Sequence, residues 1–132
     1  MGKPRVFKTK WFQRFARKEK IGDAALLNAV ARAETGQIDA DLGGGVIKQR
    51  IARVGQGKSG GYRTIIFFER GERAVFVYGF AKSRRANIDL NEEKHFKEAT
   101  RYVLRLSEKQ ISALVESGDF VEVTEHGQEI SK

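Results

Sequence analysis

The side chains best suited to chemistry are cations and aromatics that recur within three short β-rich runs. Those that we single out are Lys48, Arg50, Arg63, Tyr78 and Lys82. Alternate residues of a strand point to the same face of a sheet, so side chains spaced in this way can gather on one surface. Lysine and arginine bind phosphates, and aromatic rings stack on bases. The pattern therefore favours a surface that binds a nucleic acid.

Three strands would position these side chains, and we expect them at residues 46–52, 61–69 and 74–82, which are rich in β-branched and aromatic residues. The period of two directs one apolar set towards covering helices: Ile47, Ile51, Ile66, Phe68, Val75 and Val77. The opposite face then shows a basic and aromatic set: Lys48, Arg50, Arg63, Tyr78, Phe80 and Lys82. An ordinary solvated sheet face is the alternative, but aromatics interleaved with cations favour binding.

The positive charge of the chain is concentrated in the same region. Of the 25 lysines and arginines, ten lie within residues 43–85, where there are only two acidic residues. This difference equals the whole formal net charge of +8, so the rest of the chain is neutral in total. A concentrated positive field implies a polyanionic partner, most simply a nucleic acid, with an acidic protein as the other possibility.

Several other classes of function lack support in the sequence. There is no cysteine, which excludes disulfides and thiolate metal sites and fits a reducing cytoplasm. No apolar run approaches the ~20 residues of a membrane helix, and the N-terminus lacks the apolar core of a signal peptide. His95 and His126 do not have the spacing of a helical pair, so we expect neither a metal nor a cofactor. The glycine-rich loop at 55–61 is similar to a Walker A loop, but Ala52 stands where that motif needs glycine.

Helical periodicity appears on both sides of the β-rich region. Residues 11–36 predict a helical hairpin with an apolar side on each helix. A further helix is expected after residue 91. Ser107 and Gln110 then fit a capping box that starts a last helix, which Gly118 ends.

These elements predict an α+β fold in which an N-terminal helical hairpin packs on a twisted antiparallel sheet, followed by C-terminal helices. Residues 5–9 are a short β candidate ahead of the hairpin. The length of the chain suits one domain, which we place at residues 1–118. Residues 119–132 are expected to form a loosely ordered C-terminal tail.

The sequence resembles the RelE/HigB-type toxins of bacterial type II toxin–antitoxin systems. The resemblance rests on three blocks, at residues 47–50 (IKQR), 57–63 (GKSGGYR) and 76–82 (FVYGFAK). It implies a RelE-like fold and a cytoplasmic mRNA interferase, an endoribonuclease that cuts mRNA in the ribosomal A site and inhibits translation. It also implies a cognate antitoxin as partner, besides mRNA and the ribosome, and no membrane. Such antitoxins often carry a helix-turn-helix domain.

The resemblance implies site residues as well. The family's basic and aromatic positions match Lys48, Arg50, Arg63, Tyr78 and Lys82, which we predict to be catalytic. We expect a second set to bind RNA: Arg53, Lys58, Phe80, Arg84 and Arg85. RNA cleavage by its own 2′-OH needs a base and charge stabilisation at phosphorus. A lysine among cations favours its neutral, basic form, and arginines hold the charged phosphorane. Lys48, beside the permanently charged Arg50, is our preferred base.

Two alternative functions stay open at this point. The first is a non-catalytic nucleic-acid-binding module that uses the same basic sheet. The second is a ParE-like toxin that poisons gyrase, since that group shares the fold without the ribonuclease residues. The presence of Lys48, Arg50, Arg63 and Lys82 favours the endoribonuclease.

Overall fold

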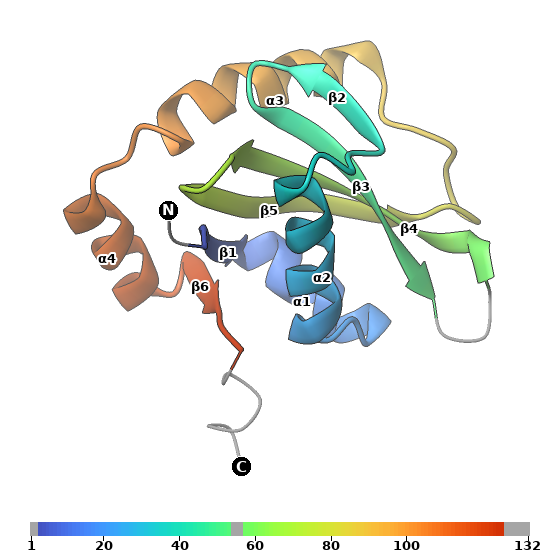
Figure 1. Cartoon of the computed structure of the whole chain (residues 1–132), viewed down its shortest axis with the longest axis horizontal. Helices are drawn as coiled ribbons and strands as arrows, with labels where there is room; N and C mark the ends of the chain where they lie inside the picture. Colours follow the sequence, from blue (N-terminus) through green and yellow to red (C-terminus); the bar gives the residue numbers. More distant parts are fainter. Residues whose placement is uncertain (1–2, 54–56, 126–132) are drawn as a thin grey trace.

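The computed structural model describes residues 3–53 and 57–125, with side chains from residue 60 onward in the second range. The elements in chain order are β1 (Arg5–Thr9), α1 (Lys10–Glu19), α2 (Asp23–Glu34), β2 (Ala40–Gly43), β3 (Val46–Arg53), β4 (Gly57–Glu69), β5 (Arg73–Ala81), α3 (Leu90–Val103), α4 (Glu108–Ser117) and β6 (Phe120–Val123) (Figure 1). Within the described residues, no helix is long and apolar enough to cross a membrane.

The strands form one six-stranded sheet with the order β2-β3-β4-β5-β1-β6. The strands β2 to β5 pair antiparallel with their neighbours in the sheet. The strand β1 runs parallel to β5 and antiparallel to β6. The sheet is therefore mixed, and its first strand in the sequence lies between two strands from much later in the chain.

This topology corrects the predicted fold class, of which the α+β character is retained. The sheet is mixed and not antiparallel, and the fold begins with β1 and not with a helical hairpin. The helices α1 and α2 follow that strand. Val6 and Phe7 of β1 are both buried, on opposite faces, so this strand belongs inside the sheet. Its neighbours are set by long-range pairing, for which the local sequence carries no signal.

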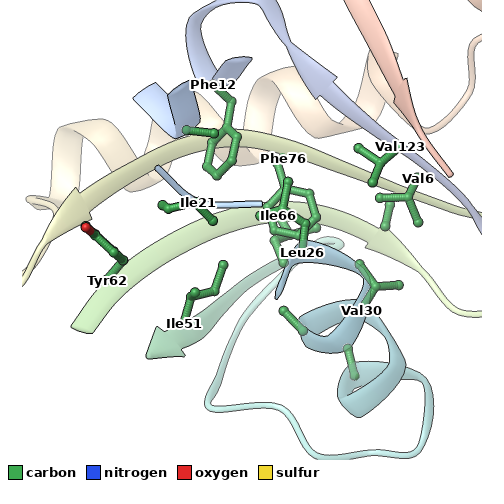
Figure 2. Packing of buried hydrophobic residues seen from close by; sticks show 14 of the residues in the cluster. Val6, Phe12, Ile21, Leu26, Val30, Ile51, Tyr62, Ile66, Phe76 and Val123 are labelled. Atoms are coloured by element: carbon green, nitrogen blue, oxygen red, sulfur yellow. The ribbon is translucent and has the colours of Figure 1, made fainter. Parts of the chain in front are cut away.

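One face of the sheet is covered by α1 and α2. The helix α1 begins where the Thr9 hydroxyl accepts a hydrogen bond from the Phe12 amide. Figure 2 shows the buried cluster, in which both helices pack on strands β3, β4 and β5 and on both partners Val6 and Val123. The predicted apolar positions Ile47, Ile51, Ile66 and Phe68 all belong to this cluster. Gly79 lets α1 approach closely, because a Cβ there would stand 2.6 Å from the Phe15 ring.

The other face is covered by α3 and α4, whereas the sequence predicted a face open to solvent. Each helix begins with a capping box, Asp89 with Glu92 and Ser107 with Gln110, and the second of these confirms the sequence prediction. Apolar residues of both helices pack on this face, among them Phe96, Ala99, Leu104, Ile111 and Leu114. The sheet is therefore enclosed between two helical layers (Figure 1).

A β-bulge in β5 changes which residues share a face. Ile65 of β4 pairs with Tyr78, but the next residue, Ile66, pairs with Phe76, so Val77 is an extra residue. As a result Phe76 faces α1, while Val75 and Val77 lie on the side of α3. The predicted positions of Val75 and Val77 are therefore wrong, because a strict period of two does not allow for an inserted residue.

The first part of the expected C-terminal tail is a strand. Residues Phe120–Val123 form β6 and pair with β1, and the backbone amide of Lys10 donates a 2.9 Å hydrogen bond to the carbonyl of Asp119. Phe120 and Val123 are buried, one in each core. The last part of the expected tail, residues 126–132, lies outside the described residues.

Candidate nucleic-acid interface

Three of the predicted cations meet on the face of the sheet that α3 partly covers. Arg50 of β3 and Arg63 of β4 are direct cross-strand partners, and Lys48 precedes Arg50 by two residues on the same face. Like charges placed directly opposite each other destabilise a sheet. Neither guanidinium makes a hydrogen bond or ion pair with any described residue. Such a pair, left unneutralised, is suited to binding an anion.

The three cations line a pocket of about 270 Å³. Its other lining residues are Asp39, Ala40, Gln49, Ala86 and Asn87. The carboxylate of Asp39 is the acid in this lining, and it already accepts a 2.6 Å hydrogen bond from the Arg50 amide. It also lies 3.9 Å from a guanidinium nitrogen of Arg32. The pocket therefore keeps an excess of positive charge.

Gln49 holds the wall of this pocket to the core. The residue lies between Lys48 and Arg50 in β3, points to the opposite face, and is fully buried. Its amide nitrogen donates to the carbonyls of Ala29 (2.9 Å) and Gln37 (3.1 Å). Its amide oxygen accepts from the amide of Asp39 at 2.8 Å. The side chain thus fixes the connection from α2 to β2 and, through it, the carboxylate of Asp39.

A chain of hydrogen bonds joins the pocket to Tyr78. The amine of Lys48 donates to the side-chain oxygen of Asn87 at 2.9 Å. Arg85 donates from Nε to the backbone carbonyl of Asn87 (2.9 Å) and from Nη1 to the hydroxyl of Tyr78 (3.0 Å). The segment between β5 and α3 therefore connects the reactive lysine to the aromatic residue on β5.

Arg85 is held in place by Glu92 of α3. Its guanidinium nitrogens donate to both carboxylate oxygens, at 3.1 Å and 2.5 Å. The hydrogen bonds from Arg85, followed by the one from the Asp89 amide, hold the pKa of Glu92 below its usual value. The same bonding to Glu92 is the largest cause of a raised pKa at Arg85. Arg85 was predicted to contact RNA, and the structure places its donors on groups of the protein itself.

Trp11 is a neighbour of this site that the sequence analysis did not include. Its ring centroid lies 4.7 Å from that of Tyr78 and 5.5 Å from that of Phe15, yet 45% of the residue is exposed. Tyr78 also contacts the rings of Phe80 and Phe96, at 6.1 Å and 5.9 Å. The strand β1 ends before this part of β5, so α1 passes the open edge of β5 and brings Trp11 to it. An exposed tryptophan at a helix start is the signal that could have indicated it.

The remaining predicted residues are placed less closely together. Lys82 and Arg84 are exposed just after β5, and Phe80 is 5% exposed in the core beneath α3. Arg53 lies with its guanidinium 5.7 Å from the ring centre of Tyr62, a residue of the core below α1 and α2. It is thus on the opposite face of the sheet from Arg50 and Arg63. The side chain of Lys58 lies outside the described residues.

Comparison with known proteins identifies the family. No curated protein matches the chain. Residues 4–123 match the family model described as the RelE toxin of the RelE/RelB toxin–antitoxin system. This range begins just ahead of β1 and ends with β6, so it includes every strand and helix described here. The chain therefore belongs to the RelE family of toxins, which act in toxin–antitoxin pairs.

Proposed function

We propose that this toxin is a ribosome-dependent endoribonuclease that cuts mRNA. The observation that carries the proposal is the unneutralised pair of Arg50 and Arg63 beside Lys48 in one pocket. A pentacoordinate phosphorane gains negative charge during cleavage, and two convergent guanidinium groups are suited to stabilise it. Membership of the RelE family supports the same conclusion.

In the proposed reaction the 2′-hydroxyl of the substrate attacks the adjacent phosphorus. Lys48, in its neutral form, takes the proton from this hydroxyl, the new O–P bond forms, and the bond to the 5′-oxygen breaks. The leaving oxygen takes up a proton, so the products are a 2′,3′-cyclic phosphate and a 5′-hydroxyl. Arg50 and Arg63 hold the phosphate, Lys82 adds positive charge and Tyr78 stacks a base. The reaction needs no metal or cofactor.

The ribosome would supply the orientation that so few residues cannot provide alone. In-line attack requires the 2′-oxygen, phosphorus and 5′-oxygen to be aligned, and holding reactants in this geometry contributes a large part of the rate. The protein would therefore act in the cytoplasm on translating ribosomes. Arg53, Lys58, Phe80, Arg84 and Arg85 remain proposed contributors to RNA binding, with Arg85 acting by holding Tyr78 and the loop after β5.

Replacement of Arg63 tests the proposal. Arg63→Ala should lower cleavage on programmed ribosomes by ~10²–10³-fold, the loss typical of a transition-state contact. Ribosome binding should persist. Lys58→Ala should weaken affinity only. Arg70→Ala removes an exposed arginine from the β4–β5 turn and serves as the matched control, with cleavage unchanged. Equal rates for the wild type and Arg63→Ala at saturating toxin would contradict the assignment.

Mapping of RNA ends separates this function from the two alternatives. Induction of an mRNA interferase produces new 5′ ends within translated messages. A gyrase poison produces DNA breaks instead, and a non-catalytic binding module produces neither. New ends that also appear with Arg63→Ala would point to another nuclease in the cell.

We also propose that the partner antitoxin neutralises the toxin by covering the basic pocket with acidic side chains. A surface with this much positive charge would otherwise bind RNA without discrimination. An antitoxin with a helix-turn-helix domain fits this role. Copurification of the toxin with the product of a neighbouring gene tests this partner, and growth unaffected by the toxin alone would count against it.

A further inference from the structure

The outer side of α1 carries a row of cations that the proposed reaction does not use. This α1 stripe consists of Lys10, Arg14, Arg17 and Lys18. Residues three and four apart lie on the same side of a helix, so the four side chains form one continuous row. All four are exposed, and none makes an ion pair or a side-chain hydrogen bond with a described residue.

The α1 stripe is unfavourable for the helix itself. The first turn of α1 has no acidic residue, and Lys10 lies at the positive end of the helix dipole. Each pair of like charges at this spacing destabilises an isolated helix by ~0.2–0.5 kcal/mol. Arg17 and Lys18 lie in the last turn, where the dipole favours cations, but this does not explain Lys10 and Arg14. A polyanionic ligand would explain all four.

No acid within α1 compensates the stripe. Glu19 is the one acidic residue of the helix, and its carboxylate accepts a 3.0 Å hydrogen bond from the hydroxyl of Tyr62 on the sheet. The whole-chain count of charges concealed this local excess, because the acidic C-terminal part of the chain balances it.

The α1 stripe and the pocket lie on opposite faces of the sheet. Phe12 and Ala16, on the inner side of α1, belong to the same core as Ile47 and Ile66. The cations of the pocket alternate with these residues along the strands and point away from α1. One polyanion bound flat on either face would therefore leave the other surface free (Figure 1).

We propose that the α1 stripe binds the phosphate backbone of ribosomal RNA and so holds the toxin on the ribosome while the pocket contacts mRNA. This inference rests on the proposed function. RNA is favoured over an acidic protein because the stripe has no apolar side chain within it, whereas the centre of a protein interface is depleted in charge. Two weak RNA contacts on one molecule act together with a high effective concentration, which would make cleavage depend on the ribosome.

Paired substitutions that remove two exposed cations each test this proposal. Lys10→Ala with Arg14→Ala removes half of the α1 stripe, and Arg101→Ala with Arg105→Ala removes two exposed, unpaired arginines at the end of α3 as the matched control. Alanine favours helices, so the first variant should melt at or above the wild-type temperature. Binding to purified ribosomes that carry an uncleavable, 2′-O-methylated message is measured at several salt concentrations.

The stripe variant should bind ribosomes more weakly and with a salt dependence reduced by about two units, while the control variant should match the wild type. In cleavage assays the effect should appear in KM, in contrast to Arg63→Ala, whose effect appears in kcat. Equal affinity and salt dependence in the stripe variant and the control would overturn the proposal. Loss of polyglutamate binding with ribosome binding intact would also overturn it. If the wild type binds through the stripe but does not cleave, the proposed function fails and the stripe assignment stands.

Discussion

At the scale of single residues, Gln49 connects the position of the pocket to the packing of the core. Strand alternation places it between Lys48 and Arg50 but on the opposite face, where it is fully buried. Its three hydrogen bonds hold the segment that leads to Asp39. A polar residue in the middle of a strand, with cations on both sides, carries no sequence signal of this anchoring role, because its partners are backbone groups far along the chain.

Gln49→Leu should lower the free energy of unfolding by at least ~2 kcal/mol, because it leaves buried backbone groups without partners. Urea denaturation measures the change. Gln13→Leu is the control, since Gln13 is half-buried on α1 and its side chain makes no hydrogen bond. Equal losses in the two variants would show that the hydrogen bonds of Gln49 contribute nothing beyond its volume.

At the scale of elements, the segment between β5 and α3 determines how Tyr78 and Lys48 are held. Arg85 joins Tyr78, Asn87 and Glu92, so the start of α3 and the end of β5 form one connected unit. The pKa of Glu92 is lowered in the folded protein, so its ionised form stabilises the fold. This stabilisation is complete above the ordinary value of 4.5 and is lost as the pH falls through the lowered pKa.

The wild type should therefore be more stable than Glu92→Gln near neutral pH, and the difference should disappear as the pH is lowered to about 3. Denaturation at a series of pH values measures it. Glu98→Gln replaces an exposed glutamate without a partner and should match the wild type throughout. A difference between wild type and Glu92→Gln that grows on acidification would reverse the sign and contradict the assigned ion pair.

The elements also show what the sequence could and could not predict. The strands β3, β4 and β5 and the meeting of Lys48, Arg50 and Arg63 followed from the period of two, because that part of the sheet is made of sequential antiparallel neighbours. Two features did not follow. The bulge at Val77 adds a residue without any change in composition, and the enclosure of the second face by α3 depends on how that helix packs.

At the scale of the whole molecule, the second helical layer is fixed to the sheet by Arg73 as well as by apolar packing. Arg73 on β5 is 8% exposed. It donates to the carbonyl of Val103 at the end of α3 (2.9 Å) and to the carboxylate of Glu108 at the start of α4 (3.2 Å). Arg5 of β1 contacts the same carboxylate. The connection between the two helices is thus bound to two central strands.

Arg73→Met should lower the free energy of unfolding by ~1–3 kcal/mol, because it leaves the Val103 carbonyl without its partner. It should also increase amide hydrogen exchange in α4 more than in α2. Arg105→Met, which alters an exposed and unpaired arginine, should change neither. Exchange in α4 equal to that of the wild type would show that apolar packing alone holds this helix.

The place of β1 has a consequence for how the chain folds. This strand is made first, but its partners are β5 and β6, and its Arg5 is 117 positions from Glu122, to which it hydrogen-bonds. Contacts so distant in sequence form slowly, because the loop between them must close before the pairing is gained. During synthesis β1 therefore waits with both edges unpaired until β5 and then β6 emerge. A nascent chain has no complete sheet, and so no complete toxin, while its own ribosome is still translating it.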